Sequence, residues 1–240
     1  AIYNETIVWQ DDRNGNWDIY MYNLTSEEEI QVTANESNQR NPEIYGDVIV
    51  WEDSRNDNRD IFMYNITSNE EVPLSINETH QRRPAIYEDR VVWIEEGNDS
   101  RQVYLYNTTS EEGAQVTTND SIKWKPVIYG DNVVWMDYRN DNWDIYMYNA
   151  SSEEEVQITT NEAVQVSSAI FNDTIVWEDS RNGNWDIFMY NITSGNETQV
   201  TTNESNQSNP AIYGDVIVWE DSRNGSLDIF MYNITSANET

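Results

Sequence analysis

The residues of this chain that could do chemistry gather in a short polar loop that occurs several times. Its first copy reads Asp11-Asp12-Arg13-Asn14-Gly15-Asn16-Trp17-Asp18. Carboxylate and amide oxygens are ligands that Ca²⁺ prefers, which makes a calcium site one interpretation. The donors do not follow the alternating spacing of a calcium loop, however, and no glutamate closes the loop as a bidentate ligand. We therefore predict no metal and no other cofactor, with calcium as the alternative.

The other interpretation of the loop is a structural ion cluster. An Asn-Gly turn places Asp11 opposite Asp18 across a β-hairpin, where two like charges destabilise the pairing. Arg13 lies two residues from Asp11, on the same face, and can neutralise both carboxylates. In the third copy, Gly97 replaces the arginine and Gln102 the second aspartate, so both charges are lost together. The sequence predicts Asp–Arg pairs, without metal, at Arg13, Arg55, Arg139, Arg181 and Arg223.

A second candidate site is a small basic and aromatic group. Residues 122–125, Ile-Lys-Trp-Lys, depart from their counterparts 38–41, Asn-Gln-Arg-Asn, more than any other connecting segment does. With the two arginines of the preceding copy, they suggest a ligand-binding patch of Arg82, Arg83, Lys123, Trp124 and Lys125. Either these cations balance nearby aspartates, or they bind an anion such as an acidic glycan.

A catalytic constellation is not recognisable in the sequence. There is no cysteine, and His80, the only histidine, is interpreted as a residue of a surface loop. Enzymes that cleave glycosidic bonds use one pair of carboxylates, whereas the repeated copies offer many carboxylates and no singular pair. The chain is therefore predicted not to be an enzyme. The alternative is a lectin or a carbohydrate-active enzyme.

One structural unit, repeated six times, must position these loops. Within residues 43–84, short segments rich in β-branched and aromatic residues alternate with Gly-Asp and Asn-Asp turn signals. Four short antiparallel strands in a repeat of this length are typical of a propeller blade. The sequence predicts an all-β, six-bladed β-propeller that closes into a ring, has almost no helix and buries one tryptophan at each blade interface. These tryptophans recur every 42 residues, at Trp9, Trp51, Trp93, Trp135, Trp177 and Trp219.

The repeats make up one predicted domain. They cover residues 1–42, 43–84, 85–126, 127–168, 169–210 and a shorter 211–240. The last repeat lacks the twelve residues that correspond to 199–210, so we expect the outermost strand of its blade to be incomplete. An incomplete blade leaves an open strand edge, which natural sheets cover. We expect that the chain is part of a longer protein, or that a strand from the preceding sequence or a neighbouring chain completes this blade.

Asparagine in the context Asn-X-Ser/Thr is unusually frequent. Seventeen such sequons occur, and one of them falls at the same position of every repeat: Asn23, Asn65, Asn107, Asn149, Asn191 and Asn233. Asn-X-Thr also makes a good polar turn, so a structural explanation is open. The other explanation, which we favour, is a glycosylated and exported protein whose glycans project from one rim. A chain with many sequons and no cysteine fits a protein of a prokaryotic, especially archaeal, cell surface.

The repeat resembles one known family. Residues 212–224, Ile-Tyr-Gly-Asp-Val-Ile-Val-Trp-Glu-Asp-Ser-Arg-Asn, and 228–233, Asp-Ile-Phe-Met-Tyr-Asn, are similar to TolB-like β-propellers found in cell-surface proteins of methanogenic archaea. The resemblance covers all 240 residues and implies the propeller fold. It suggests a surface-layer or adhesion module, although the family also includes periplasmic scaffolds and peptidase-associated propellers. The Pro-Asp-Gly turn of bacterial members is replaced here by Tyr-Gly-Asp.

Charge limits the possible partners. With 13 Lys and Arg against 44 Asp and Glu, the net charge is −31, and such a chain repels nucleic acids and anionic membrane surfaces. No apolar run reaches the ~20 residues that span a bilayer. We predict an extracellular, cell-surface propeller module, structural or adhesive, that binds a cell-envelope protein or a glycan.

Overall fold

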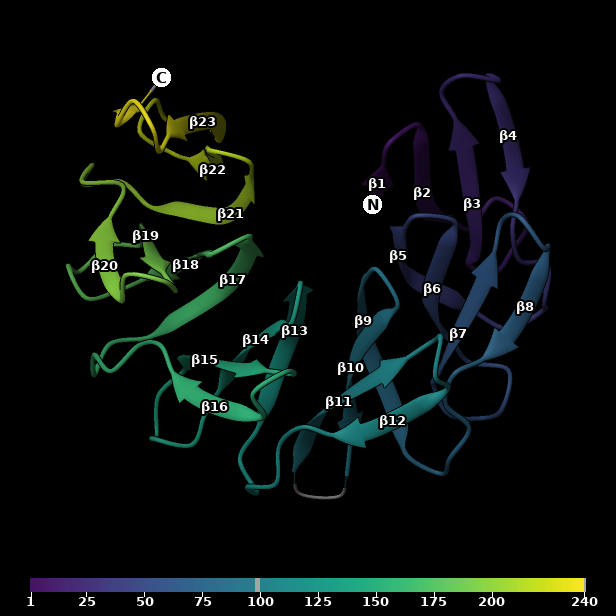
Figure 1. Ribbon diagram of the computed structural model, residues 1–240. Helices are drawn as coiled ribbons and strands as arrows, with labels where there is room; N and C mark the ends of the chain where they lie inside the picture. The colour runs from purple at the N-terminus through teal and green to yellow at the C-terminus, as the bar shows by residue number, and fades with distance from the viewer. Residues whose placement is uncertain (98–99, 240) are drawn as a thin grey trace. The chain divides into compact units, whose positions relative to one another are not determined.

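The computed structural model describes residues 1–97 and 100–239. These residues form 24 β-strands and no helix, as the sequence predicts. The strands build six sheets, each made of four consecutive antiparallel strands, which is the composition of a propeller blade (Figure 1). No described segment is a helix of the length and apolar character that crossing a lipid bilayer requires.

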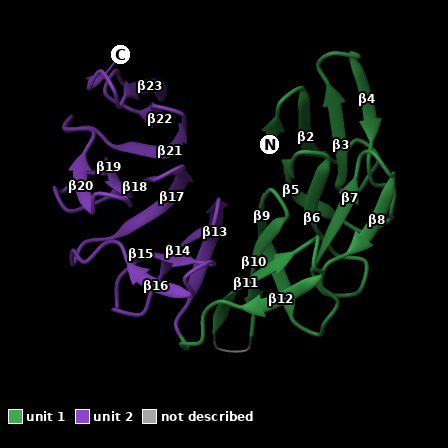
Figure 2. Ribbon diagram, viewed as in Figure 1, with its two compact units in different colours: residues 1–120 green, residues 121–240 purple. Residues whose placement is uncertain are grey.

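The chain divides into two compact units, residues 1–120 and 121–240 (Figure 2). Unit 1 contains the first three sheets. Their strands are β1 (Ile2–Tyr3), β2 (Thr6–Asp11), β3 (Asp18–Asn23), β4 (Glu28–Gln31), β5 (Gln39–Tyr45), β6 (Val48–Asp53), β7 (Asp60–Asn65), β8 (Glu70–Pro73), β9 (His80–Tyr87), β10 (Arg90–Glu96), β11 (Arg101–Asn107) and β12 (Glu112–Gln115).

Unit 2 contains the other three sheets. Their strands are β13 (Lys123–Tyr129), β14 (Asn132–Asp137), β15 (Asp144–Asn149), β16 (Glu154–Gln157), β17 (Gln165–Phe171), β18 (Thr174–Asp179), β19 (Asp186–Asn191), β20 (Asn196–Gln199), β21 (Gln207–Tyr213), β22 (Val216–Asp221), β23 (Asp228–Asn233) and β24 (Asn238–Glu239). Each sheet after the first begins four or five residues before the corresponding predicted repeat, because its first strand starts in the connecting segment.

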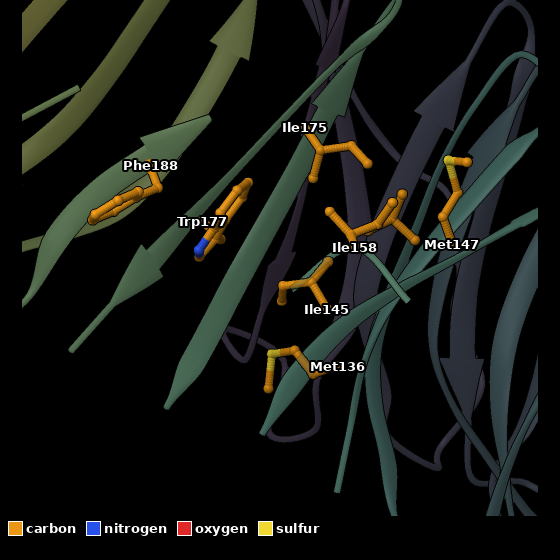
Figure 3. Packing of buried hydrophobic residues seen from close by; sticks show 8 residues of the cluster. Met136, Ile145, Met147, Ile158, Ile175, Trp177 and Phe188 are labelled. Carbon is orange, nitrogen blue, oxygen red and sulfur yellow. The ribbon is translucent and has the colours of Figure 1, made fainter. Parts of the chain in front are cut away.

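The core lies between consecutive sheets of each unit. The second strand of a sheet reads as an almost continuous apolar run, such as Val-Ile-Val-Trp in β6, because both of its faces are covered. Its tryptophan packs against the preceding sheet. Between the fourth and fifth sheets, Trp177 is fully buried with Ile145 and Ile158 (Figure 3). Trp51, Trp93 and Trp219 pack in the same way, so the predicted interface role is confirmed for them.

Burial of Trp9 at a blade interface stays a prediction, because it depends on packing between the first and last sheets, which belong to different units. The Trp9 side chain is only half-buried, whereas the other five are at most 4% exposed. Trp9 lies on β2 of the first sheet, and unit 1 has no preceding sheet to cover it. Closure of the six sheets into a ring stays a prediction.

The last sheet has a short outer strand. β24 pairs only Asn238 and Glu239 with the end of β23, whereas β20 pairs four residues with β19. The expected incomplete outer strand is therefore present. Completion of this sheet by another strand stays a prediction.

Candidate functional site

Each regular sheet carries one network of four side chains near its top loops. We use "top loops" for the loops that join second to third strands and for the segments that join one sheet to the next. In the second sheet, Trp51 Nε1 donates to Asp53 Oδ2 at 3.1 Å, and Arg55 Nη2 reaches the same oxygen at 2.6 Å. Arg55 Nη1 contacts Glu71 Oε1 at 2.6 Å, and its guanidinium lies 4.2 Å above the Phe62 ring. Arg55 therefore stabilises its sheet through charge, hydrogen bonds and cation–π contact.

The network recurs wherever the sequence keeps its members. The predicted Asp–Arg pairs are confirmed, and an outer-strand glutamate joins each of them. The pairs join Arg13 to Asp11 and Glu29, Arg139 to Asp137 and Glu155, Arg181 to Asp179 and Glu197, and Arg223 to Asp221 and Glu239.

The third sheet lacks this network among the described residues, as predicted. Gly97 and Gly113 stand where the arginine and the glutamate occur elsewhere, and Glu95 stands at the position of the aspartate. Trp93 Nε1 is consequently buried without a hydrogen-bond partner in the described part of the chain. The arginine and the outer-strand glutamate are thus lost together, whereas a carboxylate remains at the aspartate position.

The second aspartate of each loop has a different environment. Asp53 and Asp60 face each other in register, as expected. The prediction that the arginine neutralises both is wrong, because Asp60 is held by amides: Asn56 Nδ2 lies 2.7 Å and Asn58 Nδ2 3.2 Å away. Asn58 also donates to the Asn77 and Thr79 carbonyls, which fixes the connecting segment. In the described residues, no three His, Cys, Asp or Glu side chains group as metal ligands, and the absence of calcium stays a prediction.

The first aspartates predict how stability depends on pH. Burial alone would raise the pKa of Asp137, but hydrogen bonds from Arg139 and neighbouring side chains outweigh it and hold this pKa below its usual range. Asp137 therefore stabilises the fold above the unfolded pKa of about 3.9, and this contribution is lost as the pH falls through the folded pKa. We expect Asp137→Asn to lower the urea midpoint by a constant amount above about pH 5, and by less below about pH 4. A difference that does not shrink in acid would contradict this assignment.

The repeated sequon has a structural explanation. Asn65 Oδ1 accepts hydrogen bonds from the backbone N–H groups of Thr67 and Ser68, at 3.0 and 2.9 Å. Thr67 Oγ1 donates to Asp47 Oδ2 at 2.6 Å, which ties this turn to the preceding one. Corresponding hydroxyl bonds join Ser151 to Asp131, Thr193 to Asp173 and Thr235 to Asp215. Glycosylation of Asn23, Asn65, Asn107, Asn149, Asn191 and Asn233 stays a prediction.

One substitution separates the two roles of the sequon. Asn65→Asp keeps an oxygen that can accept the two turn hydrogen bonds but removes the amide to which a glycan attaches. We expect the free energy of unfolding to change by less than about 0.5 kcal/mol, and one glycan mass to disappear from protein made in its source organism. Thr67→Val, which also removes the Asp47 bond, is expected to cost about 0.5–1.5 kcal/mol. Equal losses of stability from both variants would contradict the assigned role of Thr67.

The residues of the predicted ligand patch fall in both units. Arg82 and Arg83 belong to unit 1, and Lys123, Trp124 and Lys125 belong to unit 2. The predicted ligand-binding role of Lys123 is wrong. Its side chain is fully buried, with Nζ 3.1 Å from the Ser121 carbonyl oxygen, so it does not reach a ligand in solvent. Trp124 is half-buried against the core between the fourth and fifth sheets.

Tyr138 and Trp143 form an aromatic pair in unit 2, in which Trp143 is half-buried against the core between the fourth and fifth sheets. Tyr138 and Ile122 are each 41% exposed, and Tyr138 N donates to the Ile122 carbonyl at 3.0 Å. The Tyr138 and Trp143 rings meet edge to face with centroids 5.3 Å apart. The sequence pointed to Trp124 and Ile122 but missed Tyr138, although serine stands at its position in the second, fifth and sixth copies.

A row of aromatic residues was also missed. In unit 1, the rings of Tyr3, Tyr45 and Tyr87 follow one another at the ends of the first strands, with centroids 4.6 and 4.8 Å apart. Burial, with a contribution from Tyr3, raises the pKa of Tyr45. Tyr129, Phe171 and Tyr213 form the same row in unit 2. The 42-residue spacing of these aromatics was the available signal.

The fold is that of known β-propellers. No protein-family model and no curated protein matches the chain. Among solved structures, TolB from Acinetobacter baumannii is similar with a TM-score of 0.68 and 11% identity, over 98% of this chain and 62% of that one. An oligogalacturonate lyase from Vibrio parahaemolyticus has a TM-score of 0.75 and 12% identity, over 98% of this chain and 73% of the lyase. These neighbours include TolB-like propellers, and at such identities they show the fold alone.

The comparisons correct the prediction that the chain is not an enzyme. Besides the lyase, a prolyl endopeptidase matches 98% of this chain with a TM-score of 0.78 at 9% identity, and this chain spans 40% of its length. Propellers of this fold therefore occur in enzymes. The matched region is most of the lyase but less than half of the prolyl endopeptidase. The lack of a recognisable catalytic motif was not sufficient to exclude catalysis, because repeats that resemble one another can hide an active site of few residues.

Proposed function

We propose that this chain is a binding propeller of an extracellular, cell-surface protein, and that its top loops bind a cell-envelope protein or a glycan. The observation that carries the proposal is a contrast within the repeat. Residues that build the sheets recur, such as the buried tryptophan and its Asp–Arg–Glu network. Top-loop positions that are partly or fully exposed differ from copy to copy.

The top loops differ in kind as well as in sequence. The position of Tyr138 carries Asp12, Ser54, Glu96, Ser180 and Ser222 in the other copies. The position of Trp143 carries Trp17, Arg59, Arg101, Trp185 and Leu227. The equivalent top-loop positions therefore present different charges and aromatic groups, which suits recognition of a partner by a particular set of loops. Exposed aromatic rings offer large, rigid contact surfaces.

The cell-surface location is supported by composition and by resemblance. The net charge of −31, the seventeen sequons and the absence of cysteine are all compatible with an exported prokaryotic protein. The resemblance of the repeat to surface propellers of methanogenic archaea suggests the same location, with glycans on the turns opposite the top loops. The partner proposed here is therefore a component of the cell envelope.

A carbohydrate-active enzyme is the second candidate. It is supported by the fold shared with an oligogalacturonate lyase and by the polar top loops. Incubation of the chain with oligogalacturonate tests it by ultraviolet detection of an unsaturated product. Product formation above a heat-denatured control would favour this candidate over simple binding.

The experiment for the binding proposal uses the chain's own copies as a guide. The double variant Tyr138→Ser and Trp143→Leu gives the fourth sheet the residues that the sixth sheet carries. We expect it to bind cell-envelope fractions or an arrayed glycan about tenfold more weakly than wild type, because two rigid aromatic contacts are lost. Trp185→Leu, at the equivalent loop of the fifth sheet, is the matched control. Unchanged binding by the double variant and by variants of the other top loops would refute the proposal.

A further inference from the structure

Three arginines gather in the top loops of the second and third sheets. Arg59 and Arg101 occupy a position that is tryptophan or leucine in the other copies, and Arg82 precedes the bulge of β9. The whole chain has only 13 Lys and Arg. None of the three belongs to the repeated Asp–Arg–Glu network. The scaffold therefore does not explain this concentration of positive charge in an acidic protein.

A carboxylate already lies between two of these arginines. Arg101 Nε is 2.9 Å from Glu96 Oε1, and Arg82 Nε is 2.7 Å from Glu96 Oε2, without hydrogen-bond geometry in the second case. The arginine side chains are 34% and 28% exposed, whereas that of Glu96 is 14% exposed. Within residues 1–97 and 100–239, the terminal Nη atoms of Arg82 have no partner. Glu96 thus aligns two guanidinium groups and leaves donors of Arg82 accessible.

Arg59 joins this group from the second sheet. Its backbone carbonyl accepts from Gln81 N at 2.6 Å, and its backbone N–H donates to His80 Nδ1 at 3.0 Å, which places it beside the strand of Arg82. Its only ion pair in the described residues, with Glu52, is long at 3.7 Å, and its side chain is 33% exposed. Arg59 is therefore weakly compensated.

A hollow is lined by residues that shortly precede Arg59 and His80 in the chain. Its volume is about 500 Å³, and it is lined by Asn56, Asp57, Asn58, Ile76, Asn77 and Glu78. Apolar atoms make up most of its surface, and the exposed carboxylates of Asp57 and Glu78 can accept hydrogen bonds from hydroxyl groups. Two of its lining residues are close to the arginine group in the sequence, because Asn58 directly precedes Arg59 and Glu78 lies two residues before His80.

We propose that Arg59, Arg82 and Arg101 bind the carboxylate of an acidic saccharide whose hydroxyl groups enter this hollow. Guanidinium groups form charge-assisted hydrogen bonds with carboxylates, and Glu96 shows that a carboxylate can lie between Arg82 and Arg101. The inference rests on the proposed function, because it names the ligand class for one part of the top loops.

Calorimetric titration of the chain with a trimer of galacturonic acid, at low salt, tests this site. The methyl-esterified trimer is the neutral control, and inorganic sulfate and an aspartate-rich peptide are the competing anions. We expect binding of the acid only. Arg82→Ser, which introduces the residue found at this position in the sixth sheet, is expected to weaken binding about tenfold. Arg40→Ser, at the same position of the second sheet, is the matched control and is expected to have no effect.

A second variant is expected to bind the acidic trimer more tightly, which a misfolded protein would not do. Glu96→Ser, with the serine that three other copies carry, removes the internal carboxylate that competes for Arg82 and Arg101. It is expected to bind the acidic trimer several-fold more tightly. Wild-type affinity in both Arg82→Ser and Glu96→Ser, or absence of binding, would overturn the inference, as would equal binding of the ester, sulfate or peptide. The proposed function would still be judged separately by the Tyr138 and Trp143 variants.

Discussion

Trp177→Ala is expected to lower the free energy of unfolding by about 3–5 kcal/mol, the usual effect of removing a large buried aromatic side chain. Trp177 is fully buried between the fourth and fifth sheets, against Val134, Ile145 and Ile158 (Figure 3). The substitution removes this packing and leaves a cavity that rigid strands cannot fill. It also removes the N–H group that donates to Asp179 Oδ2 at 3.1 Å. Urea unfolding monitored by circular dichroism measures the change.

Trp9→Ala is the matched control for that prediction. Trp9 occupies the same position of the repeat but is half-buried, and its Nε1 lies 3.4 Å from Asp11 Oδ2. Unfolding exposes less additional apolar surface at Trp9 than at Trp177. We therefore expect Trp9→Ala to lower the free energy of unfolding by a smaller amount, about 1–2 kcal/mol. Equal losses in the two variants would show that burial in this structure does not determine the contribution of the repeated tryptophan.

Arg181→Leu is expected to destabilise the protein by about 3–5 kcal/mol, because it leaves a buried carboxylate without its partner. The Asp179 side chain has no exposed surface, and Arg181 Nη2 lies 2.5 Å from Asp179 Oδ2. The Asp179 bond, partly offset by burial, raises the pKa of Arg181. The double variant Asp179→Asn with Arg181→Leu removes both charges, and we expect it to be less destabilised than Arg181→Leu alone. Thermal or urea unfolding of the single and double variants measures this coupling.

The first sheet again offers a control for that ion pair. The Arg13 and Asp11 side chains are 45% and 23% exposed, and solvent screens exposed pairs. We expect Arg13→Leu to cost less than about 1 kcal/mol. If Arg13→Leu proves as costly as Arg181→Leu, the destabilisation comes from lost contact with the aromatic ring beneath the guanidinium rather than from the unpaired carboxylate.

Local pattern determined most of the fold. The tryptophans at 42-residue intervals, the alternation of apolar strands with turn signals and the loss of both charges in the third copy led to six antiparallel sheets, an all-β chain and the Asp–Arg pairs. These features depend on neighbours within about ten residues or on one strand pairing. The repeat strengthens them where the copies differ, as in the third copy, because a change in one residue can be compared with a change in its partner.

Tertiary structure alone decided which partners the polar side chains choose. Sequence spacing placed Arg13 near Asp11 and Asp18, but Glu29 comes from a strand beyond the hairpin and the two amides of the loop hold Asp18. Burial of Lys123, contact of Tyr138 with Trp143 and the position of Glu96 between two arginines likewise depend on how strands stack and on which face a side chain takes. Spacing along a chain limits distance within one strand or loop. Contacts between strands follow from packing, which one sequence does not specify residue by residue.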